Sequence, residues 1–229
     1  MAKRPIFIPS QTTNLVDEIN VEFEWFPGFA VSQKQKSIAA FHDAAKELGL
    51  CKRPLEISSK SEVQLGVDLS AFNLKVALAD GRLTSLENIF QAAKIFENGG
   101  PHLDLLDTTP LEAKRDPRLK ESGDLRAFRG KTREWPIEPK TVFYDWIYAN
   151  AVLQNPDLLS GLLEYDAFTD IEFNPAKSFN CQARSAALIV YLSRNGKLSA
   201  LENEETFLSL YADNESDSGK DLSVQKFLI

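Results

Sequence analysis

The sequence predicts an α+β fold that is predominantly helical, built as one domain with a few short strands. Three observations support this prediction. One segment near the amino terminus alternates apolar and polar residues, which is typical of a half-buried strand. Several later segments repeat apolar residues at three- and four-residue spacings, as amphipathic helices do. The 229 residues are 43% apolar and 26% charged, which suits one large globular domain.

The strands are expected mainly in the first third of the chain. Residues 17–26 alternate apolar and polar side chains, and Pro27-Gly28 ends that strand. Shorter extended stretches are expected at 55–57 and 67–78, and Asp80-Gly81 marks the turn after them. Because these strands are few and short, the fold is expected to depend mainly on the packing of helices.

Helices are expected wherever apolar residues recur at helical spacing. The predicted helices cover residues 33–49, 83–96, 139–163 and 182–195. Pro156 is expected to break the third of them into two. Residues 101–133 are rich in charge and proline and are expected to form a loop with short helical pieces. The predicted domain covers residues 1–199, and residues 200–229 are expected to form an acidic, partly disordered tail.

The composition argues against several classes of protein. No apolar run is long enough for a membrane span, and the start lacks the apolar core of a secretory signal, so we expect a cytoplasmic protein. Two cysteines and two separated histidines offer neither a disulfide framework nor the usual zinc spacing, so we expect no metal and no cofactor. The net charge of −7 argues against tight non-specific binding to duplex nucleic acid, although residues 112–140 carry an excess of Lys and Arg.

The segment 83–96, LTSLENIFQAAKIF, carries the most informative pattern. On a helix, Glu87, Gln91 and Lys94 would lie within roughly 60° of one another, beside the apolar stripe. Such a row can line a cleft. Spacing alone also allows a simpler interpretation, in which Thr84 and Glu87 form a capping box and Lys94 is an ordinary solvated lysine. The spacing favours the simpler interpretation.

The same segment resembles the signature helix of the NADAR superfamily. Further blocks similar to those of the family occur in the family's order, together covering about residues 65–195: DLSAFN (68–73), REWP (133–136), FTDIEF (168–173) and NCQARS (180–185). The resemblance is strongest to the NADAR branch of antitoxins paired with DNA-modifying DarT-type toxins. The chain departs from the superfamily pattern in an inserted Leu86, in Ala183 where glycine is usual, and in lacking a W-G-x-G stretch.

This resemblance implies a function for the chain. It implies a glycohydrolase whose substrate is ADP-ribosylated DNA, modified on a base such as guanine, and whose product is ADP-ribose. It also implies a DNA ADP-ribosyltransferase toxin as functional partner and an antitoxin role for this chain. Two alternatives remain open: an N-glycosidase acting on a small nucleotide or riboflavin-pathway metabolite, and a non-catalytic module that binds ADP-ribose or the toxin.

The resemblance also changes the interpretation of Glu87 and Lys94, which become the expected catalytic residues. Glu87 would stabilise positive charge at the anomeric carbon or activate water. Lys94 would either attack that carbon and form a Schiff base or only donate a hydrogen bond.

Further residues are expected to bind the ligand. Trp135 would stack on a base or fill the core, while Phe72 and Phe90 would wall the pocket or fill the core. The arginines would bind the pyrophosphate, and Asp170 a ribose diol. The expected ligand-binding residues are Phe72, Asn73, Phe90, Gln91, Arg129, Arg133, Trp135, Asp170, Asn180 and Arg184.

Overall fold

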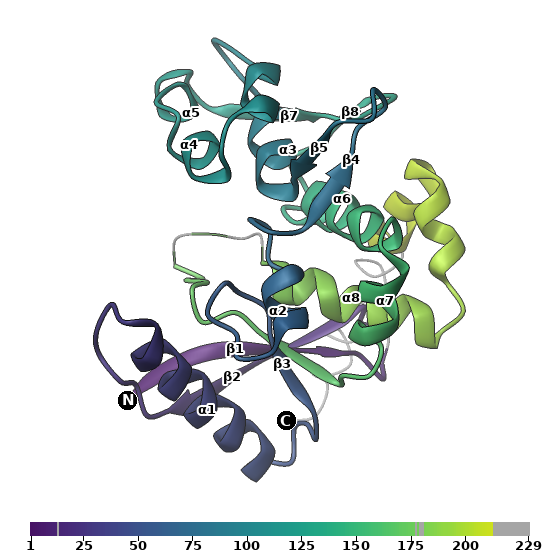
Figure 1. The fold of residues 1–229 in the computed structure, drawn as a ribbon. Coiled ribbons are helices and arrows are strands. Elements are labelled where there is room, and N and C mark those ends of the chain that lie inside the picture. Colours follow the sequence, from purple (N-terminus) through teal and green to yellow (C-terminus); the bar gives the residue numbers. More distant parts are fainter. Residues whose placement is uncertain (13, 177, 179–180, 213–229) are drawn as a thin grey trace, which may run out of the picture.

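The α+β prediction is confirmed by a computed structural model, which describes residues 1–12, 14–176, 178 and 181–212. Figure 1 shows a lower part, which contains a four-stranded sheet and the long helix α1 (Val31–Glu47), and an upper part of short helices and small sheets. The helices α6 (Val142–Leu153) and α8 (Gln182–Arg194) lie between the two parts. Within the described residues, no helix combines the length and the apolar character that a membrane crossing requires.

The four-stranded sheet brings together distant parts of the chain. β1 pairs antiparallel with both β2 and β9, and β9 pairs parallel with β3. In sheet order, the strands are β2 (Val16–Phe23), β1 (Ala2–Pro9), β9 (Ala167–Thr169) and β3 (Pro54–Glu56). The predicted strand at 17–26 is therefore confirmed in β2. β1 was not predicted, because Pro5 and Pro9 in its sequence are unusual in strands.

The two faces of this sheet bury different helices. Ile6 packs with the residues of α1, where the rings of Phe23 and Phe41 stack with centroids 4.5 Å apart. The next residue, Phe7, points to the opposite face and belongs to the larger core formed around α6 and α8. This alternation follows from the two-residue period of a strand. The larger core therefore joins the sheet to the upper part of the molecule.

The larger core also includes residues beyond α8. The segment 204–212 is helical, and its Phe207 and Tyr211 are buried against the aromatic side chains of α6 and its surroundings. These two side chains are four residues apart and so share one helical face. The packed part of the chain thus extends past residue 199.

The predicted helix at 83–96 is wrong at both ends. The helix α3 covers only Leu86–Ala92, and it lies between the strands β5 (Leu83–Ser85) and β6 (Lys94–Phe96). β5 pairs with β4 (Lys75–Ala77) and β6 pairs with β7 (Leu125–Arg129). These strand pairings, one in a local hairpin and one with a distant strand, override the local helical spacing, which reflects only burial on one side.

The remaining elements are short. The predicted extended stretch at 67–78 is wrong in its first half, since the helix α2 ends within it and only β4 is a strand. The expected loop with short helical pieces at 101–133 is confirmed as far as α5, but its end forms the strand β7; the break at Pro156 is confirmed. These elements are α2 (Gln64–Asp68), η1 (Leu103–Asp107), α4 (Pro110–Arg115), α5 (Arg118–Glu121), β8 (Glu134–Trp135), α7 (Pro156–Leu162) and η2 (Leu198–Glu202).

Candidate functional site

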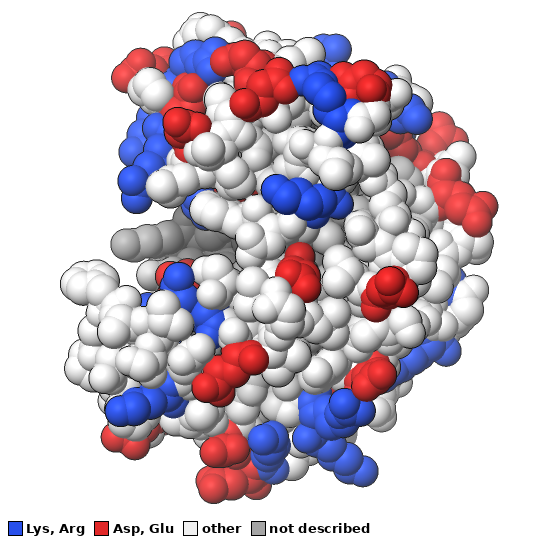
Figure 2. Space-filling model, in the orientation of Figure 1, with Lys and Arg blue, Asp and Glu red and all other residues white. Residues whose placement is uncertain are grey.

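A cavity of about 580 Å³ lies between the lower and upper parts of the molecule. Figure 2 shows a hollow at this level, which opens at the left edge of the view. The volume is within the range of sites that hold small molecules. The cavity is lined by Ser58, Ser59, Ser70, Ala71, Phe72, Glu87, Phe90, Gln91, Lys94, Lys114, Leu125, Phe128, Tyr144, Asp170, Glu172, Phe173, Asn174, Ser178 and Gln182.

The start of α3 positions Glu87 in the upper wall. The helix is capped by Ser85, whose hydroxyl accepts a hydrogen bond from the backbone N–H of Asn88 at 3.1 Å. The Asn88 amide in turn donates to the carbonyls of Leu105 and Thr108, which fixes this end of α3 to the neighbouring loop. The predicted capping box of Thr84 and Glu87 is therefore wrong. The carboxylate of Glu87 is left to face the cavity, although the residue is only 5% exposed.

A continuous chain of hydrogen bonds links the carboxylate to the amine. The amide nitrogen of Gln91 donates to Oε1 of Glu87 at 2.9 Å, and Nζ of Lys94 donates to Oε1 of Gln91 at 2.7 Å. The backbone of Lys94 belongs to β6, but its side chain still meets the last turns of α3. The expected grouping of these three residues in one cleft is thus present, with Gln91 in the middle.

The surroundings of Lys94 favour its neutral form. Burial lowers the pKa of Lys94 to about 8; Glu87 acts in the opposite direction, and the nearby charge of Lys114 lowers the pKa further. The ammonium also lies 4.8 Å from the centre of the Phe90 ring. An amine with this pKa is partly deprotonated near neutral pH, which a nucleophilic lysine requires.

A second lysine in the upper wall was not predicted from the sequence. Nζ of Lys114, on α4, lies 3.8 Å from Oε1 of Glu87 and 5.1 Å from the centre of the Phe72 ring. Its segment was singled out only as basic, and no local pattern distinguishes Lys114 from the other lysines and arginines there. Its position depends on the packing of α4 against α3. The Lys114 ammonium and the Gln91 amide therefore both approach the same carboxylate oxygen of Glu87.

We expect Lys114→Gln to raise the pKa of Lys94, because the variant removes a neighbouring positive charge. The pH dependence of reductive methylation of Lys94, followed by mass spectrometry, measures this shift without any substrate. Lys114→Arg keeps the charge and is the matched control. Its pH profile of Lys94 methylation should equal that of the wild type. An unchanged Lys94 profile in Lys114→Gln would show that solvent screens the two lysines from each other.

The opposite wall of the cavity contains Asp170, in the loop that follows β9. Its carboxylate accepts hydrogen bonds from the backbone N–H groups of Glu172 and Phe173, at 3.0 and 3.2 Å. Burial and the nearby carboxyl of Glu56 raise the pKa of Asp170 well above its usual range. Two buried carboxyl groups this close do not both ionise easily. Asp170 is therefore suited to exchange hydrogen bonds with the hydroxyl groups of a sugar.

A buried network supports this loop from behind. Glu56 accepts from the hydroxyl of Thr169 at 2.6 Å and from the backbone N–H of Ile171 at 2.8 Å. Because the Thr169 hydroxyl donates to Glu56, it accepts from Nε2 of His42, which lies 2.8 Å away. Burial lowers the pKa of His42 to about 4, so the ring is neutral. The network fixes the residues on both sides of Asp170.

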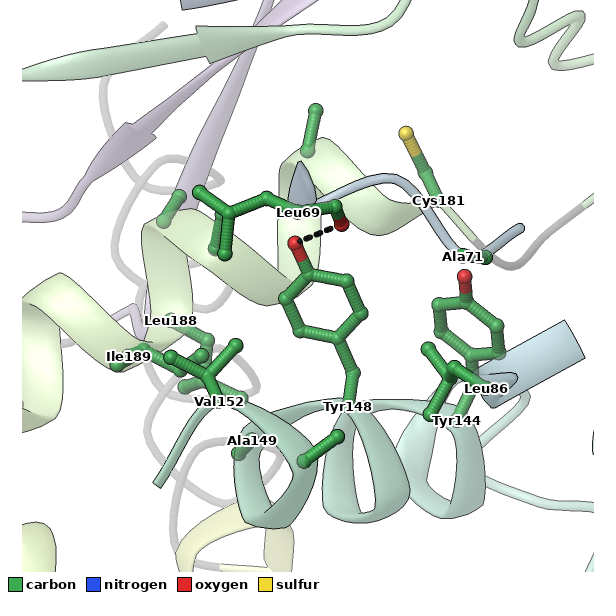
Figure 3. Close-up of a cluster of buried hydrophobic side chains, with 14 of the residues drawn as sticks. Leu69, Ala71, Leu86, Tyr144, Tyr148, Ala149, Val152, Cys181, Leu188 and Ile189 are labelled. Carbon is green, nitrogen blue, oxygen red and sulfur yellow. Dashed lines mark hydrogen bonds between the residues drawn. The ribbon is translucent and has the colours of Figure 1, made fainter. Parts of the chain in front are cut away.

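Two further side chains define the back of the cavity. The amide oxygen of Gln182 accepts from the backbone N–H of Ala71 at 2.7 Å, and its nitrogen donates to the carbonyl of Ile57. Tyr144 lies at the cavity wall and Tyr148 one turn further along α6, where its hydroxyl donates to the carbonyl of Leu69 (Figure 3). Both tyrosines rise from α6 toward the loop after α2, so the core helix supports that loop directly.

Six of the predicted site residues line the cavity: Glu87, Lys94, Phe72, Phe90, Gln91 and Asp170. Five others have their side chains elsewhere, and Asn180 lies outside the described residues. Trp135 is fully buried between Phe143, Trp146 and Phe207, so it fills the core in place of stacking on a ligand. The cavity instead has aromatic walls from Phe72 and Phe90.

The three predicted arginines and Asn73 have structural partners outside the cavity. Arg184 forms an ion pair with Asp145, and Tyr211 donates to the same carboxylate. Arg129 pairs with Glu134 at the surface, and Arg133 lines a separate groove beside η2. The amide of Asn73 donates to the carbonyl of Val67 and closes the turn after α2. Among the described residues that line the cavity, the basic ones are thus Lys94 and Lys114.

The described residues contain no group of three His, Cys, Asp or Glu side chains placed to hold a metal ion. The polar groups brought together include three carboxyl groups, two amines and three amides, from Glu87, Asp170, Glu172, Lys94, Lys114, Gln91, Asn174 and Gln182. This arrangement can bind a polar ligand, stabilise a developing positive charge and supply an amine nucleophile.

Comparison with known proteins agrees with the resemblance seen in the sequence. The family model described as the DarT1-associated NADAR antitoxin matches residues 2–221. A search of curated proteins returned no match. The family match covers nearly the whole chain and includes both walls of the cavity. The chain therefore belongs to the DarT1-associated NADAR antitoxin family.

Proposed function

We propose that this protein is an antitoxin that acts as an ADP-ribosyl glycohydrolase, removing ADP-ribose from a DNA base, with guanine as the expected base. The observation that carries the proposal is the row of Glu87, Gln91 and Lys94 in one cavity, with a buried amine beside a carboxylate. The family of the chain supports a functional pairing with a toxin of the DarT1 type.

The proposed reaction begins with Lys94 as the nucleophile. The neutral amine attacks the anomeric carbon of the base-linked ribose, the bond from that carbon to the base nitrogen breaks, and the base leaves with a proton. The ribose ring then opens, its ring oxygen takes a proton, and a Schiff base to Lys94 remains. Water adds to the Schiff base, which releases ADP-ribose and restores the amine.

Glu87 is proposed to act on the same carbon. Breaking the glycosidic bond generates positive charge at the anomeric carbon, and a nearby carboxylate stabilises that charge. Glu87 can also accept the proton that the attacking amine loses and later return it or activate the hydrolytic water. Gln91 contacts both groups and so fixes their separation.

The remaining lining residues are proposed to hold the ADP-ribosyl group. Asp170 would exchange hydrogen bonds with a ribose diol, because it lines the cavity and the backbone N–H of the next residue, Ile171, is held by Glu56. Phe72 and Phe90 would provide apolar walls. Lys114 would face a phosphate oxygen, since Lys114 is exposed whereas Lys94 is partly buried.

Comparing substrates tests the proposal. We expect release of ADP-ribose from an ADP-ribosylated oligonucleotide, measured by chromatography, and little or no cleavage of free nucleotides or riboflavin-pathway metabolites. Cleavage of a small metabolite alone would favour the alternative N-glycosidase. Tight binding of ADP-ribose or the toxin without turnover of any substrate would favour a non-catalytic binding module.

A further inference from the structure

The loop between β2 and α1 displays an unusual aromatic side chain. Phe29 is fully exposed, and the neighbouring Val31 is about half exposed. Single exposed apolar residues are common, whereas neighbouring apolar side chains exposed together can form part of a binding surface. Packing in the core therefore does not explain why an aromatic residue occupies position 29.

The loop is held in a defined conformation. The buried hydroxyl of Ser37 accepts from the backbone N–H of Phe26 at 3.0 Å and donates to the carbonyl of Gln33 at 3.0 Å. Gly28 has φ of +132°, which side-chain-bearing residues rarely adopt, and Pro27 precedes it. These features present the ring of Phe29 on a fixed turn, which reduces the entropy lost on binding.

The loop lies beside the mouth of the cavity. Lys34, in the first turns of α1, pairs at 3.3 Å with Glu172, and Glu172 lines the cavity. The same ammonium lies 4.8 Å from the centre of the Trp25 ring, which comes just before the loop. In Figure 1 the turn leading into α1 projects at the left of the lower part, and in the same orientation Figure 2 shows the hollow opening on that side.

Positive charges surround the same opening. Lys114 lines the cavity, and Nζ of Lys60 donates at 3.1 Å to Ser59, which also lines it. Lys34 lies at the same opening, with its ammonium paired with Glu172. Figure 2 shows Lys or Arg side chains both above and below the hollow. An exposed aromatic ring next to several lysines is the combination used to bind single-stranded nucleic acid, in which the ring stacks on a base and the lysines meet phosphates.

We propose that Phe29 stacks on a nucleobase flanking the ADP-ribosylated base in a single DNA strand, while Lys60 meets an adjoining phosphate. This inference rests on the proposed function and specifies how its substrate is bound. A duplex does not offer the face of a stacked base, whereas a single strand does. The negative net charge of the protein also disfavours non-specific binding to duplex DNA.

Steady-state kinetics of full-length Phe29→Ala on two substrates tests the proposal. For an ADP-ribosylated single-stranded oligonucleotide, we expect KM to rise roughly tenfold or more, because one stacking contact is lost. For an ADP-ribosylated deoxyguanosine without flanking nucleotides, we expect KM and kcat to stay unchanged. Phe29→Trp should keep the low KM for the oligonucleotide.

Leu48→Ala is the matched control, since Leu48 is another exposed apolar residue, located at the opposite end of α1. It should leave both substrates unaffected. Equal effects of Phe29→Ala on both substrates, or no effect on either, would overturn the proposal. Weaker binding of the toxin with unchanged turnover of the oligonucleotide would also overturn it and would assign the loop to a protein partner.

Binding measurements separate this proposal from the proposed function. Fluorescence anisotropy with an unmodified single-stranded oligonucleotide requires no catalysis. Binding by the wild-type protein that Phe29→Ala weakens supports the stacking contact even if neither substrate is cleaved, in which case the proposed function alone has failed. Equal binding of the oligonucleotide by both proteins contradicts the stacking contact even if cleavage occurs.

Discussion

Lys94→Ala is expected to lower kcat for release of ADP-ribose by about 10³-fold or more, because it removes the proposed nucleophile. The cavity should remain, since α3 and its cap do not depend on this side chain. Single-turnover kinetics measures the loss, and circular dichroism confirms the fold. Lys75→Ala, a change at an exposed lysine on β4, is the matched control and should retain full activity.

Three further measurements distinguish the possible roles of Lys94. Lys94→Arg keeps a positive donor but removes the nucleophilic amine, so it should be as inactive as the alanine variant if a Schiff base forms. Borohydride added during turnover should then trap ADP-ribose on Lys94 as a stable mass increase. The wild-type rate should rise about tenfold per pH unit below the pKa of Lys94 at about 8 and level off above it. An active Lys94→Arg enzyme would leave Lys94 as a hydrogen-bond donor only.

Glu87→Gln is expected to lower kcat by about 10²- to 10⁴-fold, because an amide neither stabilises the developing positive charge nor accepts a proton. The substitution preserves shape, and the new amide can still bond to Gln91. Binding of ADP-ribose, measured by calorimetry, should therefore remain within a few fold of wild type. The combination of lost turnover and retained binding is the expected signature of a group that acts mainly in the transition state.

Glu112→Gln is the matched control for this second variant. Glu112 caps α4 through Thr109 and lies outside the set of residues that line the cavity. Its loss should reduce stability slightly without reducing kcat. A fully active Glu87→Gln enzyme would remove the carboxylate from the proposed mechanism, and a variant that fails to bind ADP-ribose would point to a role in substrate binding instead.

The sequence predicted the centre of the candidate site better than its boundaries. Glu87, Gln91 and Lys94 were placed together by helical spacing, and they do meet, although Lys94 belongs to a strand. The error had little effect on the grouping because β6 begins directly after the last turn of α3. The pairing partner of β6 lies about thirty residues away, so no local pattern could have revealed it.

Residues whose roles depend on distant packing were harder to predict. Lys114 meets Glu87 because α4 packs on α3, and Gln182 joins two loops that are far apart in the chain. Trp135 was left open between stacking on a base and filling the core, and Arg184 was one of three arginines expected at the pyrophosphate. Their actual partners, the aromatic core and Asp145, are visible only when α6 and α8 are placed side by side.

The Gln91 amide between Glu87 and Lys94 has a consequence for how charge is distributed in the cavity. An amide has fixed polarity and no proton that it readily gives up, so it holds the two groups in place without passing a proton between them. A carboxylate and an amine in direct contact would stabilise each other as an ion pair and keep the lysine protonated. Gln91 keeps the amine out of direct contact with the carboxylate, so burial lowers the pKa of Lys94 to about 8 although the Glu87 charge acts in the opposite direction.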